Sequence, residues 1–523
     1  MSASSSSIKV RFLIDKEQER FVYVEAGSDF VDVLFSFLTL PLGAIVRLLK
    51  KNSGLGSLDS LYESIELLDA KHLQTEACKE MLLNPRSAAA QLCENLKVKG
   101  IHERNPTTFY TCSQDGCLIH STCHFTYTSK VRCSRCGRHM DSDWSWGEET
   151  SEEGGVFVKA ATKFMITDDL RVMPASLLKS LSLLKEMHIK DKRVLEKRLM
   201  QFGTKEALKL LGRSLVSKNA LAEVCFPDPQ VHESASSSLP IKEEIVVEET
   251  QNEIKAGLIS NKRNNGLLYA EVGDDFINQL FSLLTFPLGS VLKILSDNMS
   301  PLDACIQNLY SSINGLFSNT FKSEICRKML LTPKLATFYG YKNQLLLRFE
   351  EVRTMGSIVE GSCAKCYADN GFKSCSSTQC VHGIRVSQFV EQNPKSVKGL
   401  LDNGGGFVVG RRRFIVMDNL HVSLPSAIST TVNGENLSMS DLVGKELFLD
   451  NCTIGFFINT GSFLTVCYDL EVNRTAPLQR SPILVGCAIA DDGDRNEAWC
   501  HALLLPAKEI RLKTGDSCFY DLG

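Results

Sequence analysis

Alternating apolar and polar positions open the chain. Residues 8–14 (IKVRFLI) and 21–26 (FVYVEA) are rich in β-forming residues and flank a polar turn, which predicts a β-hairpin. In the next stretch, apolar residues recur at helical spacing: Phe30, Val31, Leu34, Phe35 and Leu38. Ser28 or Asp29 can cap this helix, and Pro41 should end it because proline has no amide donor.

Helical and strand-like patterns then follow one another. A second helix is expected from Leu42 to about Lys51, and another over residues 73–83, before Pro85. Residues 154–174 return to a β pattern. Three successive amphipathic helices are predicted after it, over residues 175–187, 191–200 and 204–216. Helices and hairpins in this order indicate an α+β protein.

The same pattern occurs twice along the chain. Residues 22–50 match residues 268–296 without a gap, and 14 of the 29 positions are identical. Two further blocks repeat in the same order: CKEMLLNP at 78–85 with CRKMLLTP at 326–333, and residues 154–174 with residues 404–425. We therefore expect two homologous modules joined head to tail.

Composition shifts place the boundaries of these modules. The first module spans residues 1–225, and residues 226–253 form an acidic linker with serines and prolines. The second module spans residues 254–447, and residues 448–523 form a divergent β-rich C-terminal segment. Each module should contain a β-hairpin, helices and a later β-hairpin, with a β-grasp-like sheet as one arrangement, and a zinc-ribbon-like cysteine insertion.

Bulk composition is that of a globular protein in a reducing compartment. The chain has 523 residues, of which 43% are hydrophobic and 23% charged, and its net charge of -3 argues against bulk binding to nucleic acid or anionic membranes. The sequence contains neither a secretory signal nor an apolar run long enough to span a bilayer. We expect a cytoplasmic or nuclear protein whose 19 cysteines stay reduced.

Four cysteines of the first module have the spacing of a metal site. Cys112 and Cys117 form a C-x4-C pair, and Cys133 and Cys136 form a C-x2-C pair in CSRCG. Zinc prefers four tetrahedral ligands, and two thiolate pairs on separate turns supply them. Nearby residues that can replace one ligand are Cys123, His120, His124 and His139. We predict structural zinc, because a catalytic ion would keep one position open for water.

A second cluster lies at the corresponding place in the second module. It consists of Cys363, Cys366, Cys375 and Cys380, with the order of the spacings reversed. Four cysteines within 18 residues are unusual for a chain of this composition, so we predict a second structural zinc ion here. Buried or incidental thiols are the alternative for both clusters.

Two other polar motifs have structural explanations. Asp168-Asp169 and Asp418-Asn419 follow strands at matching positions, where a turn explains them as well as acid–base chemistry does. Arg411, Arg412 and Arg413 form a basic cluster that nucleic-acid phosphates can contact. Nucleic-acid binding predicts that neighbouring carboxylates do not offset these arginines.

Several ordered motifs together resemble a known family. They are IKVRFLID, the YVEAGSDFVDVLFSFLTLPLG block, the CSRCG pair and FMITDDLRVMP with the LEKRL to KNAL segment after it. The chain resembles a plant-restricted family catalogued as domain of unknown function 674, over residues 8–225 and 254–425. The resemblance implies a duplicated module, and it implies no activity and no catalytic residues. The cysteine pairs at 112/117 and 133/136 are the family-like site positions.

These observations favour a non-enzymatic interaction scaffold with structural zinc and protein partners that the sequence does not identify. A zinc-ribbon protein that binds nucleic acid is one alternative. An enzyme with a cleft between the modules is another, although the sequence has no nucleophile elbow, phosphate loop, dinucleotide fingerprint or HExxH motif.

Overall fold

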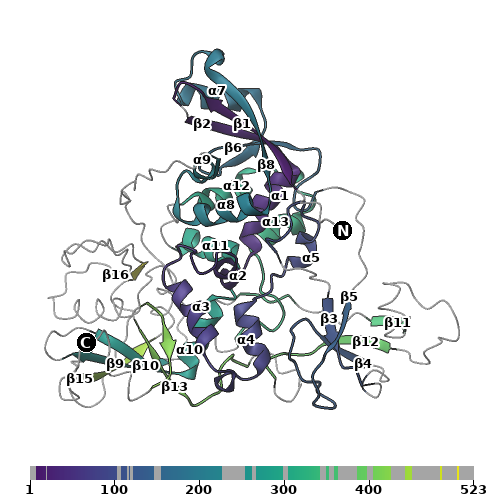
Figure 1. Ribbon diagram of the computed structural model, residues 1–523, viewed down its shortest axis with the longest axis vertical. Helices are drawn as coiled ribbons and strands as arrows, with labels where there is room; N and C mark the ends of the chain where they lie inside the picture. Colours follow the sequence, from purple (N-terminus) through teal and green to yellow (C-terminus); the bar gives the residue numbers. More distant parts are fainter. Residues whose placement is uncertain are drawn as a thin grey trace.

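The computed structural model shows three five-stranded sheets around a helical centre (Figure 1). The structure describes residues 7–18, 20–102, 108–114, 117, 122–145, 155–225, 254–261, 267–298, 304–341, 349–352, 358–362, 386–396, 405–417, 419–425, 442–449, 483–485 and 503–505. The predicted linker 226–253 and the second cysteine cluster lie outside these residues. Helices and sheets are both present, as the α+β prediction requires.

The first module builds one antiparallel sheet. Its strands are β1 (Ile8–Asp15), β2 (Arg20–Gly27), β6 (Lys163–Ile166), β7 (Val172–Pro174) and β8 (Leu195–Phe202). They lie in the order β7-β6-β2-β1-β8, so both predicted hairpins are present side by side. All four pairings are antiparallel, whereas a β-grasp sheet contains a central parallel pair, so the β-grasp comparison does not extend to strand pairing.

The prediction of a helix over residues 191–200 is wrong. Only a short turn of 3-10 helix, η3 (Lys192–Val194), precedes β8, and β8 pairs with β1 along its whole length. The pairing satisfies the backbone groups on the free edge of β1, an interaction with a distant segment that local periodicity does not show.

The second module builds a sheet of the same kind. Its strands are β9 (Ile254–Asn261), β10 (Leu267–Gly273), β13 (Arg413–Val416), β14 (Val422–Ser423) and β15 (Leu442–Leu449). Their order, β14-β13-β10-β9-β15, corresponds strand for strand to that of the first sheet. β15 continues two residues past the predicted boundary at residue 447, and the module boundaries stay a prediction.

The third sheet takes strands from both modules. Its members are β3 (Thr108–Thr111), β4 (Thr122–Thr126), β5 (Ser142–Ser145), β11 (Ile358–Ser362) and β12 (Val386–Glu391), in the order β11-β12-β4-β3-β5. The strand β12 of the second module pairs in parallel with β4 of the first. A separate small sheet pairs β16 (Ile483–Val485) with β17 (Leu503–Leu505).

Most helices lie between the first two sheets, whereas α7 (Leu177–Glu186) packs on the opposite face of the first sheet (Figure 1). Those of the first module are α1 (Ser28–Ser36), α2 (Leu42–Leu48), α3 (Ser57–Leu67), α4 (Glu76–Leu83), α5 (Ala90–Cys93), α7 (Leu177–Glu186), α8 (Thr204–Val216) and α9 (Ala220–Cys225), with 3-10 turns η1 (Phe37–Thr39) and η2 (Ala70–His72). Those of the second module are α10 (Asp274–Leu283), α11 (Leu288–Asn298), α12 (Cys305–Gly315) and α13 (Glu324–Leu331), with η4 (Ser318–Thr320). No helix in the described part of the chain is long and apolar enough to cross a membrane.

The N-cap residue of α1 is not one of the two residues predicted from the sequence. Gly27 is the N-cap residue of α1, and no side chain caps the helix. Ser28 instead donates from its hydroxyl to the Ala160 carbonyl, 3.1 Å away, and Asp29 forms an ion pair with Lys97. Both candidate caps are therefore used in contacts with segments distant in sequence, which local capping rules do not capture.

The two LPLG turns meet at the centre of the molecule. Pro41 forms an isolated β-bridge with Pro287. Leu42 N donates to Phe286 O and Leu288 N donates to Leu40 O, both at a distance of 2.9 Å. Leu42 is equivalent to Leu288 and Leu40 to Phe286, so each hydrogen bond is the counterpart of the other. The contact therefore has approximate two-fold symmetry.

Loop segments of the two modules also pair with each other at two equivalent places. Phe157 O accepts from Lys322 N at 2.9 Å, and at the equivalent place Phe407 O accepts from Gln74 N at 2.8 Å. One hydrophobic cluster includes buried residues of both modules, among them Phe35 and Phe281. The two modules share a continuous core.

Candidate metal centre

Four cysteine sulfurs converge beside the third sheet. The Sγ atoms of Cys112, Cys117, Cys133 and Cys136 all lie within 4.8 Å of one another. Cys112 Sγ lies 3.4 Å from Cys136 Sγ, and Cys133 Sγ lies 3.8 Å from Cys117 Sγ. Tetrahedral zinc with Zn–S bonds of about 2.3 Å requires sulfurs roughly 3.8 Å apart, so the group fits such an ion.

Local structure explains how three of the four cysteines are placed. Cys112 directly follows β3, whereas Cys133 and Cys136 lie in a tight hairpin closed by the bridge between Arg132 and His139. Gly137, after Cys136, has a φ of +73°, which favours glycine because a side chain would be strained there. Its N–H donates to Cys133 O at 2.9 Å and tightens this turn. We call residues 131–140 the knuckle.

The centre is anchored on helix α4. Ala77 is fully buried and packs with Cys112, Val131, Cys133 and Met140. The Thr75 side chain caps α4 by accepting from Cys78 N, which fixes the start of the helix beneath the knuckle. The small Ala77 side chain lets the knuckle approach the helix closely. Nothing in the cysteine spacing indicated this support.

The environment shifts the pKa values of two of the ligand thiols in opposite directions. A hydrogen bond from the Arg138 backbone N–H lowers the pKa of Cys136 to about 7, whereas burial raises the pKa of Cys112 to about 11. Zinc binds thiolates, so metal binding must release the remaining protons. Cys112 and Cys133 are buried and Cys136 is exposed at the rim. All four positions of a tetrahedral ion would be filled by protein.

Cys123 and His124, two of the predicted alternative ligands, do not join the four cysteine sulfurs. Cys123 is buried and its Sγ donates to the His124 carbonyl at 3.8 Å. His124 Nδ1 instead lies 2.7 Å from Ser134 Oγ, a hydrogen bond to the knuckle. Within the part of the chain that the structure describes, the four cysteines form the metal-ligand group. His120 and the second cluster, at Cys363, Cys366, Cys375 and Cys380, lie outside it.

The three arginines make contacts within the protein. Arg412 Nη1 donates to His72 Nδ1 at 2.9 Å, and Arg413 Nε lies 4.0 Å from Glu271 Oε1. The Arg411 backbone N–H donates to Asp274 at 3.1 Å, which places another carboxylate beside the cluster. Glu271 thus lies at ion-pair distance from the Arg413 guanidinium, whereas the Arg411 contact with Asp274 is made by the backbone, and nucleic-acid binding through these arginines stays a prediction.

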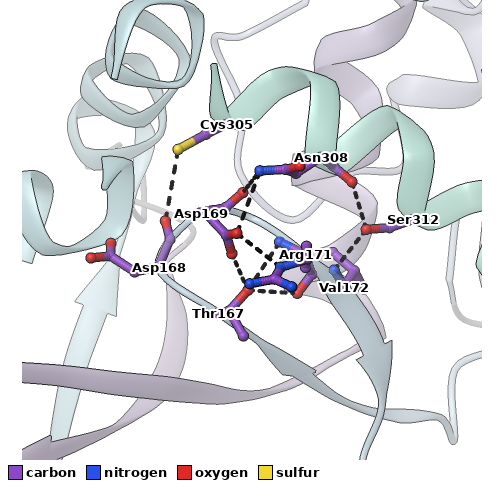
Figure 2. Close-up of polar contacts among 8 residues, drawn as sticks. All are labelled: Thr167, Asp168, Asp169, Arg171, Val172, Cys305, Asn308 and Ser312. Atoms are coloured by element: carbon purple, nitrogen blue, oxygen red, sulfur yellow. Dashed lines mark hydrogen bonds and ion pairs between the residues drawn. The ribbon is translucent and has the colours of Figure 1, made fainter. Parts of the chain in front are cut away.

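The aspartate pair forms a turn at the junction of the modules. Asp168 and Asp169 lie between β6 and β7, and Figure 2 shows Asp169 against Asn308 of α12 while the Asp168 carboxylate points away from that helix. Asn308 Nδ2 donates to Asp169 O at 3.0 Å, and Asp168 accepts from Ala222 N at 2.8 Å. Burial raises the pKa of Asp168 to about 6. These contacts agree with the turn interpretation. The matching Asp418 lies outside the described residues.

The sequence comparisons give a family and no characterised relative. No curated protein and no solved structure matches the chain. The profile of the family described as "Protein of unknown function (DUF674)" matches residues 4–447, well over half of the chain. The chain therefore belongs to this family of unknown function.

Proposed function

We propose that the protein is a non-catalytic intracellular scaffold for protein–protein interactions, stabilised by structural zinc. The convergence of four sulfurs at tetrahedral distances carries the metal assignment. A cation held by four thiolates has no open position for water or substrate, so its role is to hold the fold together. The family resemblance adds the expectation of a plant protein, and thiolate ligands suit the cytoplasm or nucleus.

Metal content tests the zinc assignment. Pure full-length protein should contain about two zinc ions per chain, one at each predicted cluster, and C117S/C133S should contain about one fewer. C123S removes a buried cysteine of the same sheet that is outside the group, and should leave the metal content unchanged. Inductively coupled plasma mass spectrometry of the three proteins measures this. Equal zinc in wild type and C117S/C133S would rule out the first centre.

An exposed apolar surface supports the interaction role. Helix α7 packs on the outer face of the first sheet through Leu184, yet Leu177 and Leu178 are 76% and 75% exposed. Leu181, one turn further on, is also exposed. Apolar side chains clustered on one helix face favour binding to another protein surface.

Proximity labelling tests this surface in cells. L177E/L178E should reduce recovery of specific neighbours several-fold, because charge on an apolar contact disfavours burial. L67E changes a similarly exposed leucine on α3 and serves as the control. Unchanged neighbours in L177E/L178E would mean that this face does not carry the interaction.

A further inference from the structure

A segment of the second module lies against the metal centre of the first. This segment, residues 386–396, consists of β12 and the five residues after it, and we call it the arm. β12 pairs in parallel with β4, with Glu391 opposite Phe125. The next residue, Gln392, continues the pairing by donating its backbone N–H to Phe125 O at 2.7 Å.

The Gln392 side chain holds the knuckle on both sides of one ligand. Its Oε1 accepts from Ser134 N at 3.1 Å, and its Nε2 donates to Arg132 O. Arg132 and Ser134 are the neighbours of Cys133 in sequence, so one amide group fixes the peptide groups before and after this cysteine. Gln392 is buried, which protects both hydrogen bonds from water.

Pro394 and Lys395 of the arm are buried and held by contacts with other parts of the protein. Lys395 is 4% exposed, donates from Nζ to Gly340 O at 2.5 Å, and lies 4.8 Å from the Phe407 ring centre. Pro394 O accepts from the Thr75 hydroxyl at 2.7 Å. Thr75 also caps α4, the helix that carries Ala77 under the cysteines. The arm thus contacts the centre both directly and through its supporting helix.

We propose that Gln392 is a positioning residue of the metal centre, through which zinc occupancy and packing of the arm stabilise each other. The inference rests on the proposed zinc centre. Residues that orient a ligand backbone without touching the metal contribute about 10- to 100-fold to metal affinity. Coupling of this kind is reciprocal, so loss of zinc should loosen the arm as much as loss of the arm weakens zinc.

Zinc transfer to a coloured chelator measures the first direction. The kinetic phase that disappears in C133S belongs to this centre. Q392A should accelerate that phase about tenfold or more. Q392E retains the size of the side chain but loses the donor to Arg132 O, so it should resemble Q392A. The control Q18A changes an exposed glutamine in the β1–β2 turn and should release zinc at the wild-type rate.

Acylation of lysines, read by peptide mass spectrometry, measures the second direction in the wild-type protein. Lys395 should react slowly when zinc is bound and at least tenfold faster after chelation, whereas exposed Lys185 should react equally in both states. Unchanged zinc release in Q392A and Q392E, or unchanged Lys395 reactivity after chelation, would overturn the coupling and leave the zinc centre intact. Absence of zinc from the wild-type protein would overturn both.

Discussion

Buried polar side chains at equivalent positions join a helix of each module to the segment that precedes the later hairpin. Asp32 of α1 is 1% exposed and accepts from the N–H groups of Val156, Phe157 and Val158 at 2.7, 2.7 and 3.0 Å. In the second module Asn278 accepts from Phe407 and Val408 in the same way. Asp32 uses both carboxylate oxygens for three buried backbone donors, and Asn278 uses its one oxygen for two.

Replacement of Asp32 by asparagine should make the stability difference from wild type depend on pH. Burial raises the pKa of Asp32 from 3.8 to about 6, so the folded state binds the proton more tightly than the unfolded chain. The penalty for the charged form is absent below the lower pKa, grows as pH rises, and is complete above about pH 6. Between about pH 4 and pH 7 the stability of D32N relative to wild type should rise by about 2–3 kcal/mol. This gain is offset at both pH values by about 1–3 kcal/mol, because asparagine has a single side-chain oxygen and one of the three N–H groups loses its acceptor.

Urea unfolding of wild type, D32N and D32L at the two pH values checks this expectation. D32L should lose stability at both, because three buried N–H groups lose their acceptor, at a cost of roughly 1–3 kcal/mol each. A D32N protein whose advantage does not grow with pH would show that Asp32 does not carry the predicted proton. Asp32 can be recognised in the sequence only as a carboxylate within an apolar stretch, so its role was not predicted.

At the scale of elements, the LPLG turns are the joint between the modules. A Cβ atom on Gly43 would lie 3.0 Å from Leu284 O, and one on Gly289 would lie 3.0 Å from Leu38 O and 2.8 Å from Leu330 O. Both glycines start helices whose backbones approach the other module closely. Glycine therefore occurs at both positions because the contact requires a small residue on each side.

Alanine at either glycine should destabilise the joint. G43A and G289A should each lower the free energy of unfolding by about 1–3 kcal/mol, since the added methyl group meets fixed backbone atoms. A Cβ atom on Gly315, at the end of α12, would meet no atom within 4 Å, so G315A is the matched control and should be neutral or slightly stabilising. Urea denaturation measures all three. Equal stability of G43A, G289A and G315A would contradict a tight joint.

Local patterns predict the elements that depend on neighbours in sequence. The first hairpin, the break at Pro41 and the start of α2 at Leu42 follow from β-forming runs and from the backbone chemistry of proline. Local periodicity indicates a helix where β8 lies, because the pairing partner of this strand, β1, is far away in sequence. Helix ends are less well predicted, because tertiary contacts also determine them.

At the scale of the whole molecule, the modules interlock. Val158 of the first forms a bridge with Phe321 of the second, and Leu73 forms the equivalent bridge with Val408. Ser64 and Ser312 likewise accept, through their hydroxyls, from the strand N–H groups of Val422 and Val172, each in the other module (Figure 2 shows the second contact). Approximate two-fold exchange of this kind is the arrangement that two copies of one module would produce.

The same interlocking limits what the sequence reveals about the site. Cysteine spacing pointed to the group at Cys112, Cys117, Cys133 and Cys136, since ligands close in sequence form such sites. Gln392 was not predicted, because it reaches the knuckle from more than 250 residues away and no spacing rule relates glutamine to a thiolate. Contacts between modules require the three-dimensional structure.

X-ray absorption spectroscopy at the zinc edge of the full-length protein tests the central claim most directly. A structural centre closed by cysteines predicts about four sulfur neighbours at roughly 2.3 Å and no oxygen or nitrogen ligand. The predicted second cluster, also of four cysteines, would give the same signal. A water-type oxygen near 2.0 Å with three or fewer sulfurs would reveal an open coordination site, and would contradict a purely structural, non-catalytic role.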